Sequence, residues 1–365
     1  MKRLCLFLAV FFLFFGLISS CSPEGIENLI AEQNSKNEED KENPGSDKDE
    51  EETGKDEKEE IEEEQEAPAA VFLSGKFVAE TEIELEFSFP VKVLSLSFEP
   101  PLEPVSVEEG NIVKVFLEEQ PEPGTRFKVS FEVEDEWENA FGAELILFAQ
   151  NNRVPNLQIN ELRTESSTAQ LRAEFIEFKI LSDGNLGALR VFAAWSPTNQ
   201  MIYQFLPVEV KAEEYVVLHL RTLEEHLCIS EYGDCLAESG GKDSSPTARD
   251  IWIPGSTKWL RKTDAVYVMD LDDNVLDAVM ISEAQGEVWS RPSLAKAAAF
   301  LFEKNAWASS TGEICRPADA VNSSGIGTAA TRSISRNESA ENVGNATNWF
   351  ATGDGGATPG MPNKH

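Results

Sequence analysis

Residues 82–89 read Glu-Ile-Glu-Leu-Glu-Phe-Ser-Phe, with an apolar side chain at every second position. Residues 127–134 repeat this pattern as Phe-Lys-Val-Ser-Phe-Glu-Val-Glu. Because successive side chains of a β-strand point to opposite faces, such alternation predicts strands with one buried and one wet face. The strands are divided by turn-forming sequences at 100–101, 109–111 and 121–124. The region from residue 68 to 150 is therefore predicted to be an antiparallel β-sandwich.

Three segments of this region carry a resemblance to a known family. Residues 85–91 read Leu-Glu-Phe-Ser-Phe-Pro-Val, residues 123–129 read Pro-Gly-Thr-Arg-Phe-Lys-Val, and Asp135 and Asn139 follow. Together they resemble bacterial Ig-like (SbsA-type) domains of exported proteins, with Glu138 where that family usually has glycine. The resemblance implies a spacer or a binding scaffold.

A second β-rich region follows a polar hinge at residues 151–155. Its strand-like blocks are Leu157–Leu162, Glu174–Ile180, Asn185–Val191, Tyr203–Pro207, Glu214–Leu218 and a hairpin over Asp264–Val279. The order of these blocks, ending in Thr358-Pro359-Gly360-x-x-Asn363, resembles the lamin-tail domain. That resemblance covers residues 156–364 and implies a second Ig-like β-sandwich.

Two insertions interrupt the second region, at residues 222–259 and 285–326. The second contains Pro292 followed by alanines and large apolar residues, which predicts one amphipathic helix. Leu294, Ala298, Leu301 and Phe302 are expected to pack on the sandwich, the alternative being a membrane-binding helix. Because large loops on a sandwich are common recognition sites, a protein or polysaccharide partner is expected at these insertions.

The first twenty-one residues have the features of a secretory signal. Lys2 and Arg3 precede an apolar run to Ile18, and Ser19-Ser20-Cys21 follows. The run is shorter than the ~20 residues that span a bilayer. Residues 18–21 resemble the lipobox of bacterial lipoproteins, which implies lipidation of Cys21 with diacylglycerol and a further acyl chain such as palmitate. We therefore expect an exported protein that is lipid-anchored to the bacterial cell envelope. The expected position is the outer membrane, on its periplasmic or its surface face, and the N-terminal lipid is the expected contact with that membrane.

The net negative charge of the chain is large and sets residues 22–67 apart as a separate segment. The formal net charge is −34, and residues 22–67 contain 20 acidic and 5 basic residues with few apolar ones. Such a segment cannot bury enough surface to fold, so it is expected to be a disordered acidic tether. Residues 68–365 contain 45 acidic and 24 basic residues. Both parts would repel phosphate backbones, which makes nucleic acid an unlikely partner; the sequence sets no oligomeric state.

These patterns predict an all-β protein with two Ig-like antiparallel β-sandwich domains in tandem. The second domain carries a helical insertion, and both follow the acidic tether. The predicted divisions are a signal peptide at 1–21, the tether at 22–67, and the two domains at 68–150 and 156–364.

Three cysteines follow Cys21, namely Cys228, Cys235 and Cys315. In an exported protein they suggest one disulfide and one remaining thiol. We favour a possible disulfide between Cys228 and Cys235, while a long-range bridge to Cys315 stays open. His226 with these cysteines has the ligand types of a zinc site, and His226 with Cys228 resembles a base and nucleophile, but the disulfide loop is the preferred interpretation.

Other candidate groups have structural interpretations. His219 lies in an apolar strand and is expected to face solvent or to be packed, and no role is assigned to His365. Asp270, Asp272 and Asn274 begin like a calcium loop but lack its later ligands, so a hairpin turn is expected. Glu161, Glu174 and Glu177 have the residue type of paired catalytic carboxylates, yet they lie in strand blocks and structural roles are expected.

The leading hypothesis is a non-enzymatic envelope protein without a cofactor, which presents its two domains to a partner or has a structural role. The alternative is an accessory to extracellular nucleic-acid or phosphate-ester processing.

Overall fold

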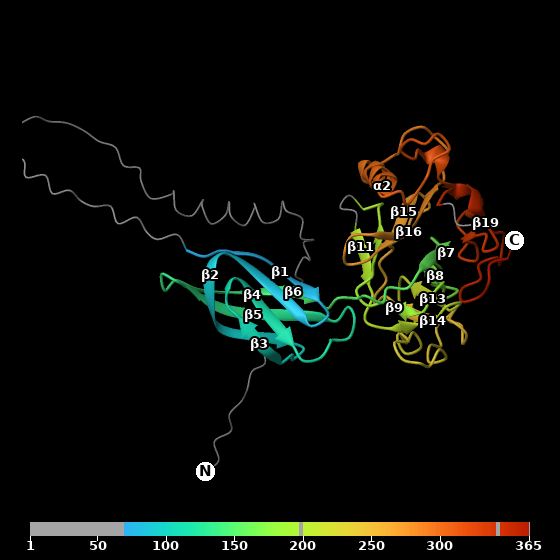
Figure 1. Ribbon diagram of the computed structural model, residues 1–365. Helices are drawn as coiled ribbons and strands as arrows, with labels where there is room; N and C mark the ends of the chain where they lie inside the picture. The colour runs from blue at the N-terminus through green and yellow to red at the C-terminus, as the bar shows by residue number, and fades with distance from the viewer. Residues whose placement is uncertain (1–68, 197–199, 341–343, 365) are drawn as a thin grey trace, which may run out of the picture. The chain divides into compact units, whose positions relative to one another are not determined.

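The computed structural model describes residues 69–196, 200–340 and 344–364. The predictions for the signal, for Cys21, for the tether and for His365 lie outside these residues. Within them the protein is all-β apart from one α-helix and three short 3-10 turns (Figure 1). No helix in these three ranges has the length and apolar character needed to cross a membrane.

The first β region has six strands around one apolar core. They are β1 (Phe72–Ala79), β2 (Glu82–Glu99), β3 (Pro104–Glu108), β4 (Gly110–Leu117), β5 (Arg126–Asp135) and β6 (Ala140–Phe148). The long strand β2 pairs with β1 and β4 along its first half and with β5 along its second half. All six strands thus belong to one hydrogen-bonded sheet. Phe87 of β2 and Phe131 of β5 both lie in its core, and their rings meet edge to face with centroids 5.5 Å apart.

The alternation in the sequence accounts for this core. Ile83, Leu85 and Phe87 are buried, as are Phe127, Val129, Phe131 and Val133, whereas the polar residues between them are more exposed. Each large apolar side chain removed from water contributes about 1.5–3 kcal/mol. The predicted antiparallel pairing and buried face of these strands are confirmed.

The second β region consists of two main sheets. A five-stranded sheet has the order β11 (Gln200–Gln204), β10 (Arg190–Ala193), β15 (Asp264–Met269), β16 (Val275–Ser282) and β17 (Val321–Asn322). A six-stranded sheet has the order β14 (Arg249–Trp252), β13 (Tyr215–His219), β8 (Phe175–Ile180), β7 (Leu157–Arg163), β18 (Ile334–Arg336) and β19 (Trp349–Ala351). Their facing sides share one core, so the predicted sandwich is confirmed.

Two details of this sandwich differ from the predictions. The block 185–191 is not one strand: β9 (Gly184–Asn185) pairs with β12 (Glu209–Val210), and Ala188 turns the chain with φ of 62° before β10 begins. The first insertion also supplies a strand, because β14 pairs in parallel with β13. Parallel partners come from distant segments, so local alternation did not reveal this pairing.

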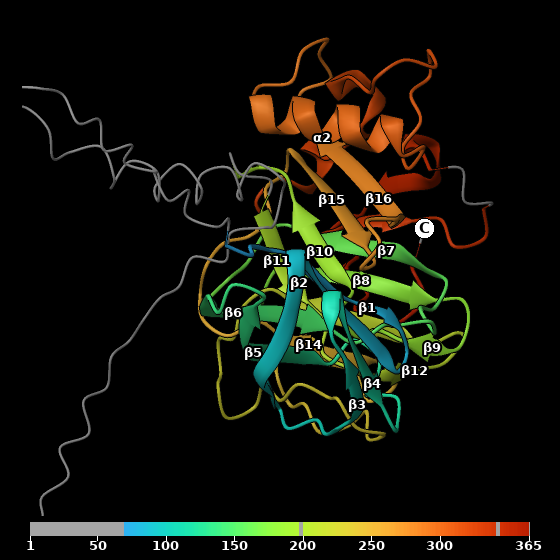
Figure 2. The same cartoon turned by 60° about the vertical axis from the view of Figure 1, so that its left-hand side comes forward.

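The second insertion contains the helix α2 (Pro292–Glu303), which contacts β15 and β16 and is drawn above their upper ends in Figure 2. Pro292 occupies its first turn, as predicted. Leu294, Ala298 and Leu301 are buried in the shared core, but Phe302 is 38% exposed. The prediction for Phe302 was therefore wrong. Leu301 is the last buried residue of the helix, and Phe302, one residue further on, points away from the buried face.

Candidate functional site

The outer face of the six-stranded sheet bears a layer of buried polar side chains. Residues 161, 177 and 335 are paired across β7, β8 and β18 and point to the face opposite the apolar core. The first insertion and the C-terminal segment cover this face, since they supply most of the hydrogen-bond partners described below. This layer contains Glu161, Glu177 and His219, three of the candidate residues named from the sequence.

Glu161 and Glu177 lie together in this layer and bind the end of the chain. Glu161 accepts hydrogen bonds from the hydroxyls of Ser333 and Ser335 at 2.5 and 3.0 Å, and from the Thr358 amide at 3.0 Å. Glu177 accepts from the Gly360 amide at 2.6 Å and from the Asn160 side chain at 2.8 Å. The backbone amides of the C-terminal segment thus donate to these two carboxylates, where in a β-strand they would donate to the carbonyl groups of a neighbouring strand.

A third carboxylate completes the attachment of this segment. Glu338 accepts from the Asn363 amide at 2.7 Å, from Lys179 Nζ at 2.8 Å and from the Tyr215 hydroxyl at 2.8 Å. The Asn363 side chain donates to the carbonyls of Asn160 and Arg336, each at 3.0 Å. The sequence motif Thr358-Pro359-Gly360-x-x-Asn363 thus has a structural function in this region.

Burial determines the ionisation of the inner pair. It raises the pKa of Glu161, and it raises the pKa of Glu177 well above its ordinary value with a further contribution from the neighbouring Glu161 charge. Both side chains are fully inaccessible to solvent. Carboxyl groups of this kind could exchange protons with substrate only if the covering segment moved away.

Glu174 is separate from this pair. Its carboxylate lies against the Arg221 guanidinium, with Oε2 2.5 Å from Nε and Oε1 accepting from a terminal nitrogen at 2.8 Å. The structure thus brings together two of the three glutamates named from the sequence and places the third in a buried ion pair.

His219 is buried and belongs to a row of planar side chains. Its Nε2 lies 2.7 Å from Asp250 Oδ1, and its ring stacks on Trp252 with centroids 3.7 Å apart. On the neighbouring strand β8 the Phe175 ring lies 6.4 Å from the His219 ring between centroids. The Arg163 guanidinium of β7 lies 4.7 Å from the centre of the Phe175 ring. The possibility that His219 faces solvent was wrong, because β14 of the first insertion covers it.

The first insertion is fixed by Glu231 and Asp250, neither of which the sequence indicated as important. Glu231 is buried and accepts from the amides of Glu238, Ser239 and Asp250 at 3.0, 3.0 and 2.8 Å. Asp250 also accepts from the Ser245 amide at 2.8 Å. The run Ile251-Trp252-Ile253, of β-branched and aromatic residues, was the available signal for this strand.

The predicted bridge between Cys228 and Cys235 is not formed, and these two residues and Cys315 are free thiols. Cys228 is half-buried, with its sulfur close to Gly241, whereas Cys235 is exposed. Burial raises the pKa of Cys228, and it raises the pKa of Cys315 to about 12. Sequence spacing alone could not supply the facing Cβ positions that a disulfide needs.

The two alternatives to the disulfide loop, a Cys–His nucleophile and a zinc site, are not formed by the described residues. His226 is exposed, and no hydrogen bond joins it to Cys228 in the described part of the chain. A raised pKa keeps Cys228 as a thiol, which is opposite to what a nucleophile needs. Across the described ranges, no group of three or more His, Cys, Asp or Glu side chains is placed to hold a metal ion.

The Asp270 segment forms a hairpin turn between β15 and β16. The Asp270 carboxylate accepts from the amides of Asp272 and Asn274 at 2.9 Å each, and from the Asn274 side chain at 3.0 Å. Asp273 has φ of 60°. Asp135 binds Trp137 and Asn139 in the same way after β5, so the two regions use one turn design.

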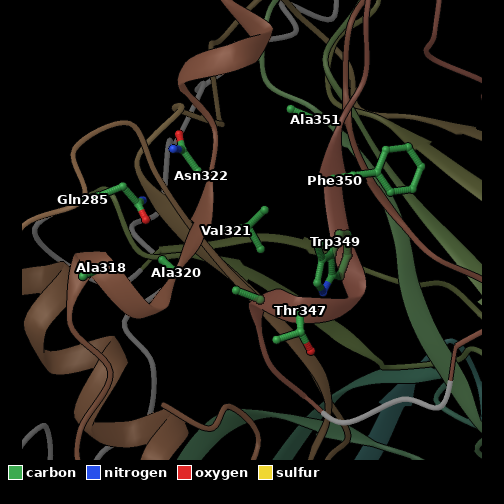
Figure 3. A pocket seen from close by; sticks show the side chains of 10 residues that line it. Gln285, Ala318, Ala320, Val321, Asn322, Thr347, Trp349, Phe350 and Ala351 are labelled. Atoms are coloured by element: carbon green, nitrogen blue, oxygen red, sulfur yellow. The ribbon is translucent and has the colours of Figure 1, made fainter. Parts of the chain in front are cut away.

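A cleft of about 420 Å³ opens between the second insertion and β19 (Figure 3). Its floor is buried, and its mouth has amide and hydroxyl side chains. The lining residues are Gln285, Ala318, Ala320, Val321, Asn322, Ala346, Thr347, Trp349, Phe350 and Ala351. A partner site was predicted in this insertion, but the residues that line the cleft could not be named from the sequence. The reason is that β17 and β19 meet only in the folded chain.

Comparison with known proteins gives three findings. The family model TP_1001_2nd, described as a protein second domain, matches residues 155–351. An uncharacterised protein of Treponema pallidum (strain Nichols) is 26% identical over 172 residues, which are 44% of this chain and 42% of that protein's length. A crystal structure of a DUF4876 family protein from Bacteroides thetaiotaomicron is 12% identical, with 79% of this chain and 93% of that chain covered. The TM-score of this pair is 0.24.

Proposed function

This chain belongs to the TP_1001_2nd family, and we propose that it is a lipid-anchored envelope protein that binds a partner without catalysis. The partner contacts the insertions of the second β-sandwich, and the first sandwich acts as a spacer. The mature chain is held to the membrane through Cys21, and residues 22–67 keep the folded part away from the lipid surface.

This proposal rests on one observation, that the ionisable groups on the six-stranded sheet bind segments of the chain itself. Glu161, Glu177 and Glu338 bind the chain's own C-terminal segment, and Asp250 and Glu231 bind its first insertion. Groups that could perform chemistry thus hold loops in place. A scaffold that fixes its loops so firmly suits binding, since preorganised loops lose little entropy when a partner docks.

The lamin-tail-like character of the second domain is supported by the same contacts. The Ile-Asn-Glu block of β7 and the Glu-Phe-Ile-Glu block of β8 supply the carboxylates that bind the Thr-Pro-Gly-x-x-Asn segment. These blocks were the ones that carried the resemblance.

The second insertion presents apolar side chains to solvent. Val288 is 84% exposed and Ile314 is 48% exposed, and both flank α2 in the sequence. A partner that contacts this insertion would remove both aliphatic side chains from water, which is favourable.

Two measurements test the proposal. Cells fed radioactive palmitate should label the wild-type chain, whereas Cys21→Ser should remain unlabelled and leave the detergent phase in a partition assay. An unlabelled wild-type chain would refute the anchor.

The second measurement is capture of envelope proteins from detergent extract by the immobilised mature chain. A variant with Val288→Asp and Ile314→Asp should lose the captured partner. Leu94→Asp is the matched control, since Leu94 is a 47% exposed aliphatic residue of the first sandwich. If the control abolishes capture and the double variant retains it, binding does not depend on the second insertion.

A further inference from the structure

Strand β19 has a free edge that faces the cleft. Hydrogen bonds from Asn337 N–H to Asn348 C=O and from Thr352 N–H to Ser333 C=O set its register with β18. In an antiparallel pair the backbone groups of alternate residues face the partner strand. Ala351 therefore directs its N–H and C=O away from β18, and in the described ranges neither group has a hydrogen-bond partner.

A second donor without a partner lies at the floor of the cleft. The Trp349 side chain is 8% exposed, and its indole N–H has no hydrogen-bond partner among the described residues. Figure 3 shows the indole nitrogen on the side of Thr347, among the lining side chains. The Arg336 guanidinium covers the ring at 4.5 Å from its centre, which fixes its orientation. Buried donors are rarely left unpaired, so this group points to a ligand that brings an acceptor.

The walls of the cleft restrict the chemistry of that ligand. Four alanines, at positions 318, 320, 346 and 351, leave room for close approach of a backbone, and none of the described residues that line the cleft is charged. A volume near 420 Å³ is at the small end of the usual range for ligand sites. An uncharged ligand with alternating hydrogen-bond donors and acceptors satisfies these conditions. A sugar is disfavoured, because it would stack on the Trp349 ring and the Arg336 guanidinium already covers that ring.

We propose that the cleft binds an extended, uncharged peptide segment of a partner protein, which adds to β19 as a further strand. The segment pairs with the N–H and C=O of Ala351, one of its acceptors receives the Trp349 indole N–H, and its small side chains enter the alanine-lined space. Main-chain pairing gives such complexes affinity, and the side-chain pocket gives them specificity. This inference rests on the proposed function, since it names the partner's chemistry at the second insertion.

The test uses the full mature chain and fluorescent nonapeptides composed of Ser, Thr, Val, Ala and Gln. Binding is followed by fluorescence anisotropy. At least one peptide should bind saturably, and the same peptide with proline at alternate positions should bind at least tenfold more weakly, because proline cannot donate a backbone hydrogen bond. If no peptide binds below 1 mM, the proposal is wrong.

Three variants locate the site. Ala351→Pro removes the edge N–H and should weaken binding at least tenfold, and Trp349→Phe should weaken it about tenfold. Ala318→Leu fills the mouth from an exposed position and should weaken binding in a chain that still folds. Trp307→Phe is the control, because Trp307 is also a buried tryptophan of the second insertion but does not line the cleft; its binding should equal that of wild type.

The outcomes separate this inference from the proposed function. If peptide binding is unchanged in the cleft variants, or if neutral oligosaccharides bind in place of peptides, the strand-addition site is refuted while insertion-dependent capture can still stand. If peptides bind at the cleft but the chain is neither lipidated nor able to capture an envelope partner, the proposed function fails and the cleft assignment holds.

Discussion

Glu138 holds a backbone conformation that side chains rarely adopt. Its φ is 64°, in the last position before Asn139 of the turn that follows β5. The left-handed conformation costs an L-residue other than glycine about 1–2 kcal/mol. Asp135 compensates by accepting from the backbone of Trp137 and Asn139.

The change Glu138→Gly should therefore stabilise the first β region by about 1 kcal/mol, which corresponds to roughly 4–8 °C in the melting temperature of a small domain. Calorimetry of the full chain measures this shift. Glu136→Gly is the control, since Glu136 lacks a positive φ and should gain no stability. Equal melting temperatures for wild type and Glu138→Gly would show that the Glu138 backbone is unstrained.

The three thiols should differ strongly in reactivity. Cys235 is exposed, Cys228 is half-buried, and Cys315 is buried with its pKa raised to about 12. Because only the thiolate is alkylated, iodoacetamide at pH 8 should modify Cys235 first, Cys228 more slowly, and Cys315 only after unfolding. Peptide mass spectrometry of timed samples gives the three rates. Fewer than three modified cysteines after unfolding without reductant would reveal a disulfide and restore the sequence prediction.

At the scale of elements, a strand could be predicted from the sequence where its own polar and apolar residues alternate. The alternation around Phe87 and Phe131 follows from a buried face and needs no knowledge of the partner strand. The contact of His219 with Asp250 could not be predicted in this way, because it depends on a strand 31 positions further along the chain. The cleft likewise arises between β17 and β19, two short strands whose sequences show no periodicity.

The C-terminal segment is an element without its own secondary structure, and buried carboxylates hold it. Since burial raises the pKa of Glu177 above the unfolded value of 4.5, its contribution to stability is fully present below pH 4.5. That contribution is lost as the pH rises through the folded-state pKa, because ionised Glu177 is then buried beside Glu161.

Replacing Glu177 by Gln should therefore flatten the pH dependence of unfolding. The stability of wild type relative to Glu177→Gln should fall by up to about 1.4 kcal/mol per pH unit above pH 4.5. Urea unfolding at pH 5, 6 and 7 measures this difference. Glu313→Gln, at an exposed site, should follow wild type at every pH. Parallel curves for wild type and Glu177→Gln would show that Glu177 has the same pKa in the folded and unfolded states.

At the scale of the whole molecule, charge separates the proposed function from a role in nucleic-acid processing. Residues 22–67 and residues 68–365 both have a large excess of acidic side chains. At 10 mM salt the screening length is about 30 Å, so this charge repels phosphates over distances of that order. A phosphate binder would show its strongest binding under these same conditions, because released counterions drive such complexes.

The mature chain should therefore leave a 20-base-pair DNA duplex and a single-stranded RNA unshifted in gels at 10 mM salt, at protein concentrations up to 10 µM. A chain without residues 22–67 should also give no shift, since residues 68–365 are acidic on their own. The shortened chain matters as a control because a tether can hide a basic patch by binding to it. A shift that appears for either chain and weakens between 10 and 150 mM salt would establish a phosphate-binding surface, and would favour the accessory role over capture of an envelope partner.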